Sequence, residues 1–111
     1  MTDLHLGDLP SPVRDFFEAT NGGDTERLLA LMASDVTIDD VGRLVEGPAA
    51  VGAWNASNNI GVRNHFEIHG AHVDGDEQHV AFRLSGDGFN GEANAAFRTR
   101  DGLIERVRFY A

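Results

Sequence analysis

Asp-Val-Thr-Ile-Asp-Asp-Val-Gly-Arg-Leu-Val-Glu-Gly, residues 35–47, is the stretch around which the rest of the chain is organised. Val36 to Asp39 have the composition of a short strand, in which side chains alternate between two faces. Val36 and Ile38 should therefore face a core, and Asp40 has the same parity. A strand that keeps its register directs this carboxylate into an apolar interior, where an unpaired charge is costly and where catalytic bases are found. The alternative is that the strand ends at Asp39 and that Asp40 begins a solvated turn.

Composition restricts the function classes. The chain has 111 residues, which is enough for one domain with one core, and its formal net charge is −9. A polyanion is repelled by nucleic acid and by anionic membrane surfaces, so we expect neither as a partner. The sequence shows no signal peptide and no apolar run long enough to span a bilayer. Cysteine is absent, which excludes disulfides and fits a cytoplasmic protein.

The first half of the chain predicts helices. Residues 1–10 read as a flexible N-terminal lead-in, and residues 11–111 as a single domain. Ser11-Pro12 is a typical helix start, with Ser as the cap, and Asn21-Gly22-Gly23 ends that helix. Its apolar face, at positions i, i+3, i+4 and i+7, consists of Val13, Phe16, Phe17 and Thr20.

Two further helices are predicted. Asp24 caps the second, which extends to Asp35 and buries Leu28, Leu29, Leu31 and Met32. The third begins at Gly47-Pro48 and carries Val51, Trp54 and Asn58 on one face, with Asn55 beside them.

The second half predicts an antiparallel meander. Segments 63–74, 77–85, 89–100 and 103–110 are rich in strand-forming residues, and Asp-Gly pairs separate them, which is a strong hairpin signal. Alternation makes one sheet face apolar, where the helices should pack, and the other polar. The apolar face includes Phe66, Ile68, Val80, Phe82, Leu84, Ala93, Ala95, Phe97, Val107 and Phe109. The fold class is α+β.

The order of these elements resembles the SnoaL-like branch of the nuclear transport factor 2-like superfamily. The motifs that carry the resemblance are Asn-Gly-Gly-Asp at 21–24, Ser-Asp-Val-Thr-Ile-Asp-Asp at 34–40, Gly-Pro-Ala-Ala-Val-Gly-Ala-Trp at 47–54 and Arg-Asp-Gly-Leu-Ile at 100–104. The resemblance covers residues 11–111. It implies a cone-shaped, curved antiparallel sheet that wraps around the N-terminal helices and encloses an apolar cavity. Members include ketosteroid isomerases, polyketide cyclases and limonene epoxide hydrolases, and also non-catalytic binding or dimerisation domains, so the fold alone does not choose a function.

The resemblance carries over residue by residue only in part. Asp40 stands where ketosteroid isomerases place the carboxylate that moves the proton. Phe16 replaces their oxyanion-hole tyrosine, and Ala95 replaces its acidic partner and the cyclases' aspartate. Phe109 follows Arg108 where the epoxide hydrolases carry an aspartate. The familiar form of each of these reactions therefore lacks a group here.

These residues support two hypotheses. The first is a small-molecule enzyme, an isomerase, cyclase or hydratase, that needs no cofactor and uses Asp40 as general base on a hydrophobic substrate. The second is a non-catalytic domain of the same fold that binds a small apolar ligand or only dimerises. The candidate substrate-binding residues are Phe16, Thr20, Trp54, Asn55, Asn58, Phe66, Phe82, Ala95, Phe97 and Phe109.

The histidines of the second half match no known zinc signature, and we predict no metal site. His65, His69 and His79 instead belong to the polar sheet face, together with Arg83 and Arg98. In proteins of the resembled fold this face often meets a second subunit, so the resemblance implies a homodimer.

Overall fold

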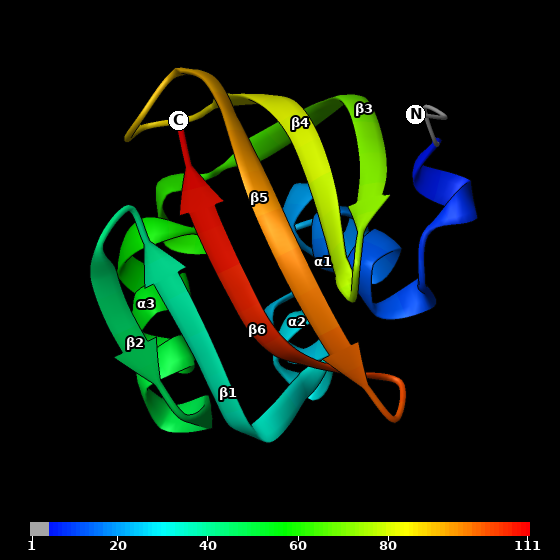
Figure 1. Ribbon diagram of the computed structural model, residues 1–111. Helices are drawn as coiled ribbons and strands as arrows, with labels where there is room; N and C mark the ends of the chain where they lie inside the picture. The colour runs from blue at the N-terminus through cyan, green and yellow to red at the C-terminus, as the bar shows by residue number, and fades with distance from the viewer. Residues whose placement is uncertain (1–4) are drawn as a thin grey trace.

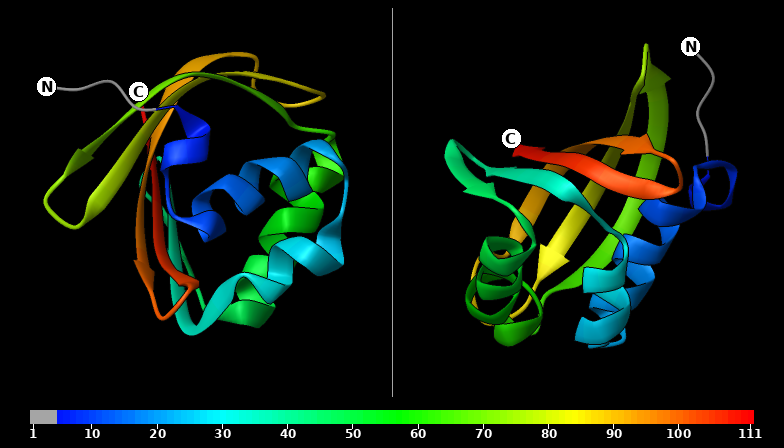
Figure 2. Two further views of the ribbon diagram at one scale, coloured as in Figure 1. Left: turned by 90° about the vertical axis from the view of Figure 1, so that its right-hand side faces the viewer. Right: turned by 90° about the horizontal axis from the view of Figure 1, so that it is seen from below.

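The computed structural model describes residues 5–111, which form a curved, unclosed six-stranded sheet with the helices on its concave side (Figures 1 and 2). The helical segments are η1 (Leu6–Asp8), α1 (Ser11–Asn21), α2 (Thr25–Ala30), α3 (Pro48–Asn58) and η2 (Ile60–Val62). The strands are β1 (Met32–Asp40), β2 (Arg43–Glu46), β3 (His65–Asp74), β4 (Glu77–Ser85), β5 (Gly91–Arg100) and β6 (Leu103–Tyr110). The predicted α+β class is confirmed. Within the described residues, no helix is long and apolar enough to cross a membrane.

The sheet has the strand order β2-β1-β6-β5-β4-β3. β3 to β6 form the predicted meander, with two-residue turns at Gly75-Asp76 and at Asp101-Gly102. β1 and β6 pair in parallel, which departs from the predicted all-antiparallel sheet. Alternation within each strand could not reveal this pairing, because the two strands are separated by α3 and the whole meander. The parallel register places Asp40 beside Phe109.

α1 follows the predicted pattern, with Val13, Phe16, Phe17 and Thr20 all buried. Pro10 occupies the cap position that we expected for Ser11, and it makes no side-chain cap hydrogen bond. Residues 1–4 of the predicted flexible lead-in lie outside the described residues. In the remainder of that segment, Leu9 is buried in the core.

The predicted extent of the second helix is wrong. Asp24 caps α2 as predicted, since its Oδ1 accepts a hydrogen bond from the backbone N–H of Arg27 at 3.1 Å. The helix ends at Ala30, however, and β1 begins at Met32 rather than near Val36. Pairing with β6 explains the difference: the N–H of Ile104 donates to the carbonyl of Leu31 at 2.8 Å and draws this segment into the sheet.

The register of β1 against β6 shifts between Met32 and Thr37 and is then regular from Thr37 to Asp40. The strand therefore includes Asp40, and the alternative that Asp40 begins a turn is wrong. Asp40 pairs with Arg43 of β2, a strand that the sequence did not predict. The two residues between them, Val41 and Gly42, have φ angles of 51° and 92°. A two-residue hairpin of type I′ requires positive φ at both positions, and a β-branched residue adopts that conformation only under strain.

We therefore expect Val41→Asn to stabilise the protein by about 1 kcal/mol, because asparagine tolerates the left-handed region that valine resists. Val41 is 73% exposed, so the substitution removes little packing. Chemical denaturation of both forms measures the change. The turn at Asp101-Gly102, with φ angles of 54° and 78°, already has the favourable composition, so Asp101→Asn is the matched control that should change little. A destabilised Val41→Asn variant would contradict the strain argument.

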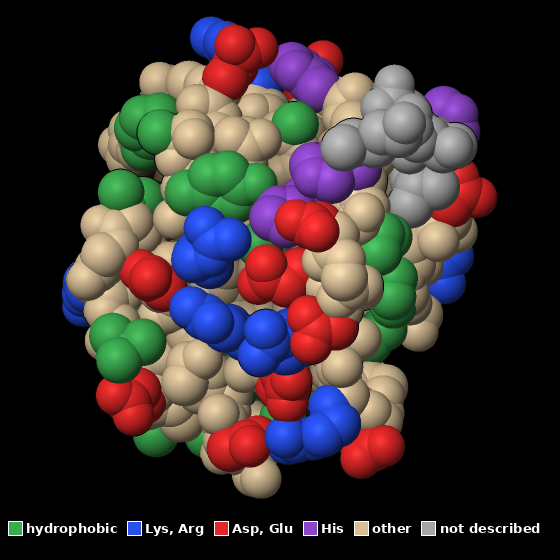
Figure 3. Space-filling view, viewed as in Figure 1, with side chains coloured by type: hydrophobic (Ala, Val, Ile, Leu, Met, Phe, Trp, Pro, Cys, Tyr) green, Lys and Arg blue, Asp and Glu red, His purple; other side chains and the backbone are tan. Residues whose placement is uncertain are grey.

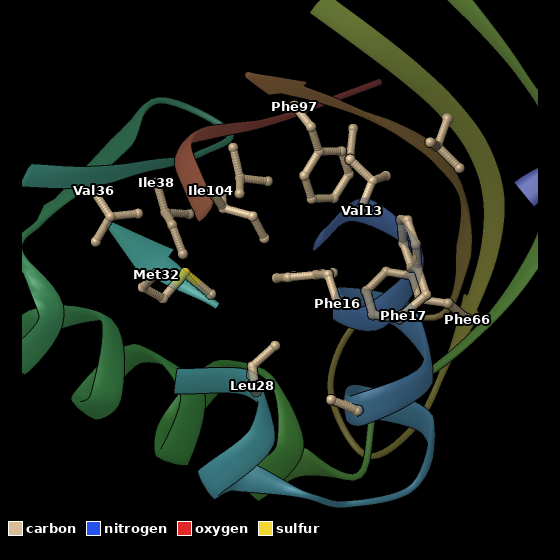
Figure 4. Packing of buried hydrophobic residues seen from close by; sticks show 14 of the residues in the cluster. Val13, Phe16, Phe17, Leu28, Met32, Val36, Ile38, Phe66, Phe97 and Ile104 are labelled. Carbon is tan, nitrogen blue, oxygen red and sulfur yellow. The ribbon is translucent and has the colours of Figure 1, made fainter. Parts of the chain in front are cut away.

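The core lies between α1 and the concave face of the sheet (Figure 4). Phe16 packs edge-on against Phe17 at 5.4 Å and against Phe97 at 5.2 Å between ring centroids. Phe66 contacts Phe17 at 5.1 Å and Phe82 at 4.8 Å in the same manner. These aromatic contacts fill the end of the cone that is covered by α1.

The outer face of the sheet is polar and carries mixed charges (Figure 3). Arg100 contacts Asp35 at 2.7 Å and Glu105 at 2.8 Å, and the hydrogen bond from Arg100 lowers the pKa of the Asp35 carboxyl below its usual value. His72 and His79 stack at 4.8 Å between ring centroids. Within residues 5–111, no group of three or more His, Cys, Asp or Glu side chains is arranged to hold a metal ion.

Candidate functional site

A cavity of about 350 Å³ opens at the end of the cone opposite the β5–β6 turn. Its walls come from the end of β1, from α3 and η2, from β3 to β6, and from the loop between β4 and β5. Most of the lining is apolar, and its aromatic members are Trp54, Phe66, Phe82, Phe89, Phe109 and Tyr110. The polar wall residues are Asp40, Asn58, Asn59, Asn64 and Glu92. A mostly apolar pocket with a few polar groups is typical of a site for a small organic molecule.

Asp40 and Trp54 form the central polar contact of this wall. Trp54 is buried on α3 and its Nε1–H donates to Asp40 Oδ2 at 2.9 Å. The Trp54 ring stacks on Phe109, with 5.9 Å between centroids and 25° between planes. Asp40 is half-buried, and no donor among residues 5–111 reaches its second oxygen, Oδ1. One carboxylate oxygen is thus held by the indole, while the other has no hydrogen-bond donor within residues 5–111.

Asn58 lies one turn after Trp54, at the end of α3. Its Oδ1 accepts a hydrogen bond from Arg43 Nη1 at 3.3 Å, and Ser57 Oγ lies 2.8 Å from the same oxygen. Because an arginine can only donate, this contact determines which end of the amide is the oxygen. Asn58 Nδ2 has no acceptor among the described residues and is therefore a free donor on the cavity wall.

Two of the polar wall residues, Asn59 and Asn64, belong to a buried amide network. Asn59 is fully buried, and its Nδ2 donates to Thr20 Oγ1 at 3.2 Å and to Asn55 Oδ1 at 3.0 Å. Asn64 Nδ2 donates in turn to Asn59 Oδ1 at 3.2 Å. Asn55 Nδ2 completes the chain by donating to Thr25 Oγ1 at 3.2 Å. The network joins α1, α2, the end of α3 and the segment that leads from η2 into β3, and it fixes the polar end of the cavity.

An ion pair holds the rim of the cavity, which is formed by the β4–β5 loop and the end of η2. Arg63 donates to both carboxylate oxygens of Asp87, at 2.8 and 3.0 Å, and these hydrogen bonds lower the pKa of Asp87 below its usual value. The N–H of Asp87 also donates to the carbonyl of Val62 at 2.8 Å. The β4–β5 loop is therefore attached to η2, and it holds Phe89 at the cavity with 59% of that residue exposed.

Comparison with known proteins supplies the family. The sequence profile of the SnoaL-like domain matches residues 13–107. The chain belongs to the SnoaL-like domain family. Curated protein sequences gave no match.

Three solved structures show how widely this SnoaL-like fold is used. A Sinorhizobium meliloti protein assigned to the polyketide cyclases is 28% identical, with a TM-score of 0.85 over 96% of this chain and 99% of that one. A computationally designed 17-OHP binder is 25% identical, with a TM-score of 0.79 over 91% of this chain and 88% of that one. The Δ5-3-ketosteroid isomerase of a Mycobacterium species is 24% identical, with a TM-score of 0.79 over 91% and 90%, and it shows the fold alone.

The SnoaL-like cavity brings together some of the residues predicted from the sequence. Asp40, Trp54, Asn58, Phe66, Phe82 and Phe109 border it. Phe16, Thr20, Asn55, Ala95 and Phe97 are buried and are not among the residues that line it. These five residues lie deeper in the cone than the cavity does, in the core or in the amide network, where α1 packs against the sheet. Strand and helix periodicity gives the face on which a side chain lies but not its distance along the cone.

The cavity is also lined by residues that were not predicted from the sequence as site residues. The polar and aromatic ones are Asn59, Asn64, Phe89, Glu92 and Tyr110, and the small or aliphatic ones are Val41, Val62, Leu84, Gly88, Ala93 and Ala111. Asn55 and Asn59 are four residues apart on a helix, a spacing that could have signalled the amide pair. Glu92 has the parity of the outer face and gave no such signal, because it reaches the rim only where the sheet ends.

Proposed function

We propose that this SnoaL-like domain binds a small hydrophobic molecule in its cavity and moves a proton on it with Asp40 as general base. The observation that carries the proposal is the carboxylate of Asp40, which borders an aromatic cavity with one oxygen held by Trp54 and the other free. Preorganisation of this kind is what acid-base catalysis requires.

The proposed chemistry uses two polar groups that both border the cavity, Asp40 of β1 and Asn58 of α3. Asp40 Oδ1 accepts a proton from an acidic C–H or O–H of the ligand and returns it to another atom, so the carboxylate is restored without a cofactor. The free amide of Asn58 donates to a ligand oxygen on which negative charge develops. Isomerisation, cyclisation and hydration each need such a relay.

Two of the solved structures support a polycyclic, largely apolar ligand. One is assigned to the polyketide cyclases at 28% identity, and the other is a designed 17-OHP binder at 25% identity. A cavity of about 350 Å³ is within the range of small-molecule sites.

A second candidate is ligand binding without catalysis. Phe16 and Ala95 occupy the positions where the resembled isomerases carry their oxyanion donors, and both are fully buried. No polar side chain therefore reaches the cavity from these two positions, and the side-chain amide of Asn58 is left as the donor on the α3 wall.

The homodimer through the outer sheet face stays a prediction from the resemblance, which light scattering of the purified chain would test.

Trp54 gives the test of the proposed function, because it is the single tryptophan of the chain and lies on the cavity wall. We expect a Δ5-3-ketosteroid to change its fluorescence saturably. Ala93→Phe fills the cavity from the β5 wall and should weaken binding at least about tenfold. Ala81, half-buried on β4 and absent from the cavity lining, gives the matched control Ala81→Phe.

Turnover of the same ketosteroid, followed by the absorbance of the conjugated product, separates the two candidates. Binding with turnover supports the enzyme, and binding without turnover for this and for polyketide-like substrates supports the binding domain. Absence of saturable binding for both ligand classes would reject the cavity as a ligand site.

A further inference from the structure

The charge of the cavity wall is one-sided. Asp40 and Glu92 both border the cavity, and no Arg, Lys or His stands among the residues that line it within the described part of the chain. Neither carboxylate has an arginine within salt-bridge distance among residues 5–111. The imidazole of His69 contacts Glu92, with 3.6 Å between His69 Nδ1 and Glu92 Oε1.

No arginine of the described residues lines the cavity. Arg83 is exposed and is the cross-strand partner of Glu92 in the β4–β5 register, but no salt bridge joins the two side chains among residues 5–111. Arg98, Arg100 and Arg108 pair with acidic residues on the outer sheet face. Arg63 is held by both oxygens of Asp87. Arg43, which is opposite Asp40 in the β1–β2 hairpin, donates to the amide of Asn58 and is exposed to solvent. The residues that line the cavity within residues 5–111 therefore include two carboxylates and no basic side chain.

We propose that the cavity selects its ligand by charge and takes a lipophilic ammonium compound, a protonated amine on an aromatic or alicyclic skeleton, in preference to an anion of the same shape. This inference rests on the proposed function only in that the cavity must hold a hydrophobic ligand. It adds the ligand's charge, which the function proposal leaves open.

Three features recognise such a ligand. The free Oδ1 of Asp40 accepts a hydrogen bond from the ammonium group, and a charge-assisted bond in a half-buried position is stronger than one in water. The aromatic walls attract a cation through their ring faces. Glu92, with 69% of its side chain exposed, raises the local concentration of cations at the entrance. A carboxylate in the same place would lose its hydration and face two like charges.

The experiment uses three probes with one naphthalene ring: 2-naphthylmethylamine, 2-naphthylmethanol and 2-naphthoate, which at pH 7 are cationic, neutral and anionic. Calorimetric titration of the full chain should give affinities in that order, with the amine at least about tenfold tighter than the naphthoate. Glu92→Gln and Asp40→Asn should each lower this ratio about threefold or more. Asp101→Asn, on the turn at the other end of the sheet, makes the same change in net charge and should leave the ratio unchanged.

Each other outcome overturns the inference. If the alcohol binds and the naphthoate binds as tightly as the amine, the charge preference is wrong while the proposed ligand cavity stands. If Asp101→Asn lowers the ratio as much as Glu92→Gln does, the preference reflects net charge and not the cavity. If none of the three probes binds, the ligand cavity and the inference fall together.

Discussion

Asp40→Asn should abolish proton transfer and leave the fold about as stable as that of the parent. Asparagine keeps an oxygen that accepts the Trp54 Nε1–H now bonded at 2.9 Å, so the contact between β1 and α3 is retained. The amide cannot take up a proton as a base, and removing a positioned base lowers turnover by roughly 10²–10⁴-fold. Because Asp40 is half-buried and no basic side chain pairs with it among the described residues, loss of its charge should change the free energy of unfolding by less than about 1 kcal/mol.

Turnover of a bound substrate and chemical denaturation of each form measure the two effects. Asp39→Asn is the matched control, since Asp39 is the neighbouring carboxylate of the same strand and lies outside the cavity lining. Its Oδ1 accepts a hydrogen bond from the N–H of Gly42 at 2.7 Å, which asparagine also provides. Full activity in Asp40→Asn would remove the proposed base. A loss of more than about 2 kcal/mol would make Asp40 a structural residue of the hairpin instead.

The alternation of a single strand was enough to place Asp40. Val36 and Ile38 are fully buried, and the same parity brings Asp40 to the cavity wall. The local sequence could not place Trp54 against it, because that contact depends on how α3 crosses β1. Phe16 and Phe97 show the opposite difficulty: their faces were predicted correctly, but packing around α1 encloses them in the core.

Fold prediction failed where a distant strand overrides local preference. Leu31 and Met32 fit the apolar side of a helix, yet pairing with β6 draws Met32 into β1. The hairpins of the meander were predictable, because an Asp-Gly pair lies at or next to each turn. Asp101-Gly102 forms its turn as predicted, whereas the β3–β4 turn is Gly75-Asp76, one residue later than predicted. The β1–β2 turn contains a Val-Gly pair, and valine disfavours the positive φ that this turn requires. That pair therefore gave no signal for a hairpin here.

Asn59→Ala should be the most destabilising single change at the site, by about 2–4 kcal/mol. Asn59 is fully buried, and its removal takes a donor from Thr20 Oγ1 and from Asn55 Oδ1 and an acceptor from Asn64 Nδ2. A buried polar group without a partner costs about 1–3 kcal/mol, and other contacts compensate in part. The N–H of Ile60 still reaches Asn55 Oδ1, at 3.4 Å.

Asn58→Ala is the control for this change, because it makes the same substitution at the adjacent, exposed position. It should cost less than about 1 kcal/mol while weakening ligand binding through the lost amide donor. Asn59→Ala should instead lower the free energy of unfolding more than Asn58→Ala does. Amide hydrogen exchange should increase at the end of α3 and in the segment before β3, which the network joins. Urea denaturation compares the two variants. Equal losses would mean that solvent enters this end of the cavity and satisfies the network, in which case Asn59 does not fix the wall on which Asn58 and Asn64 stand.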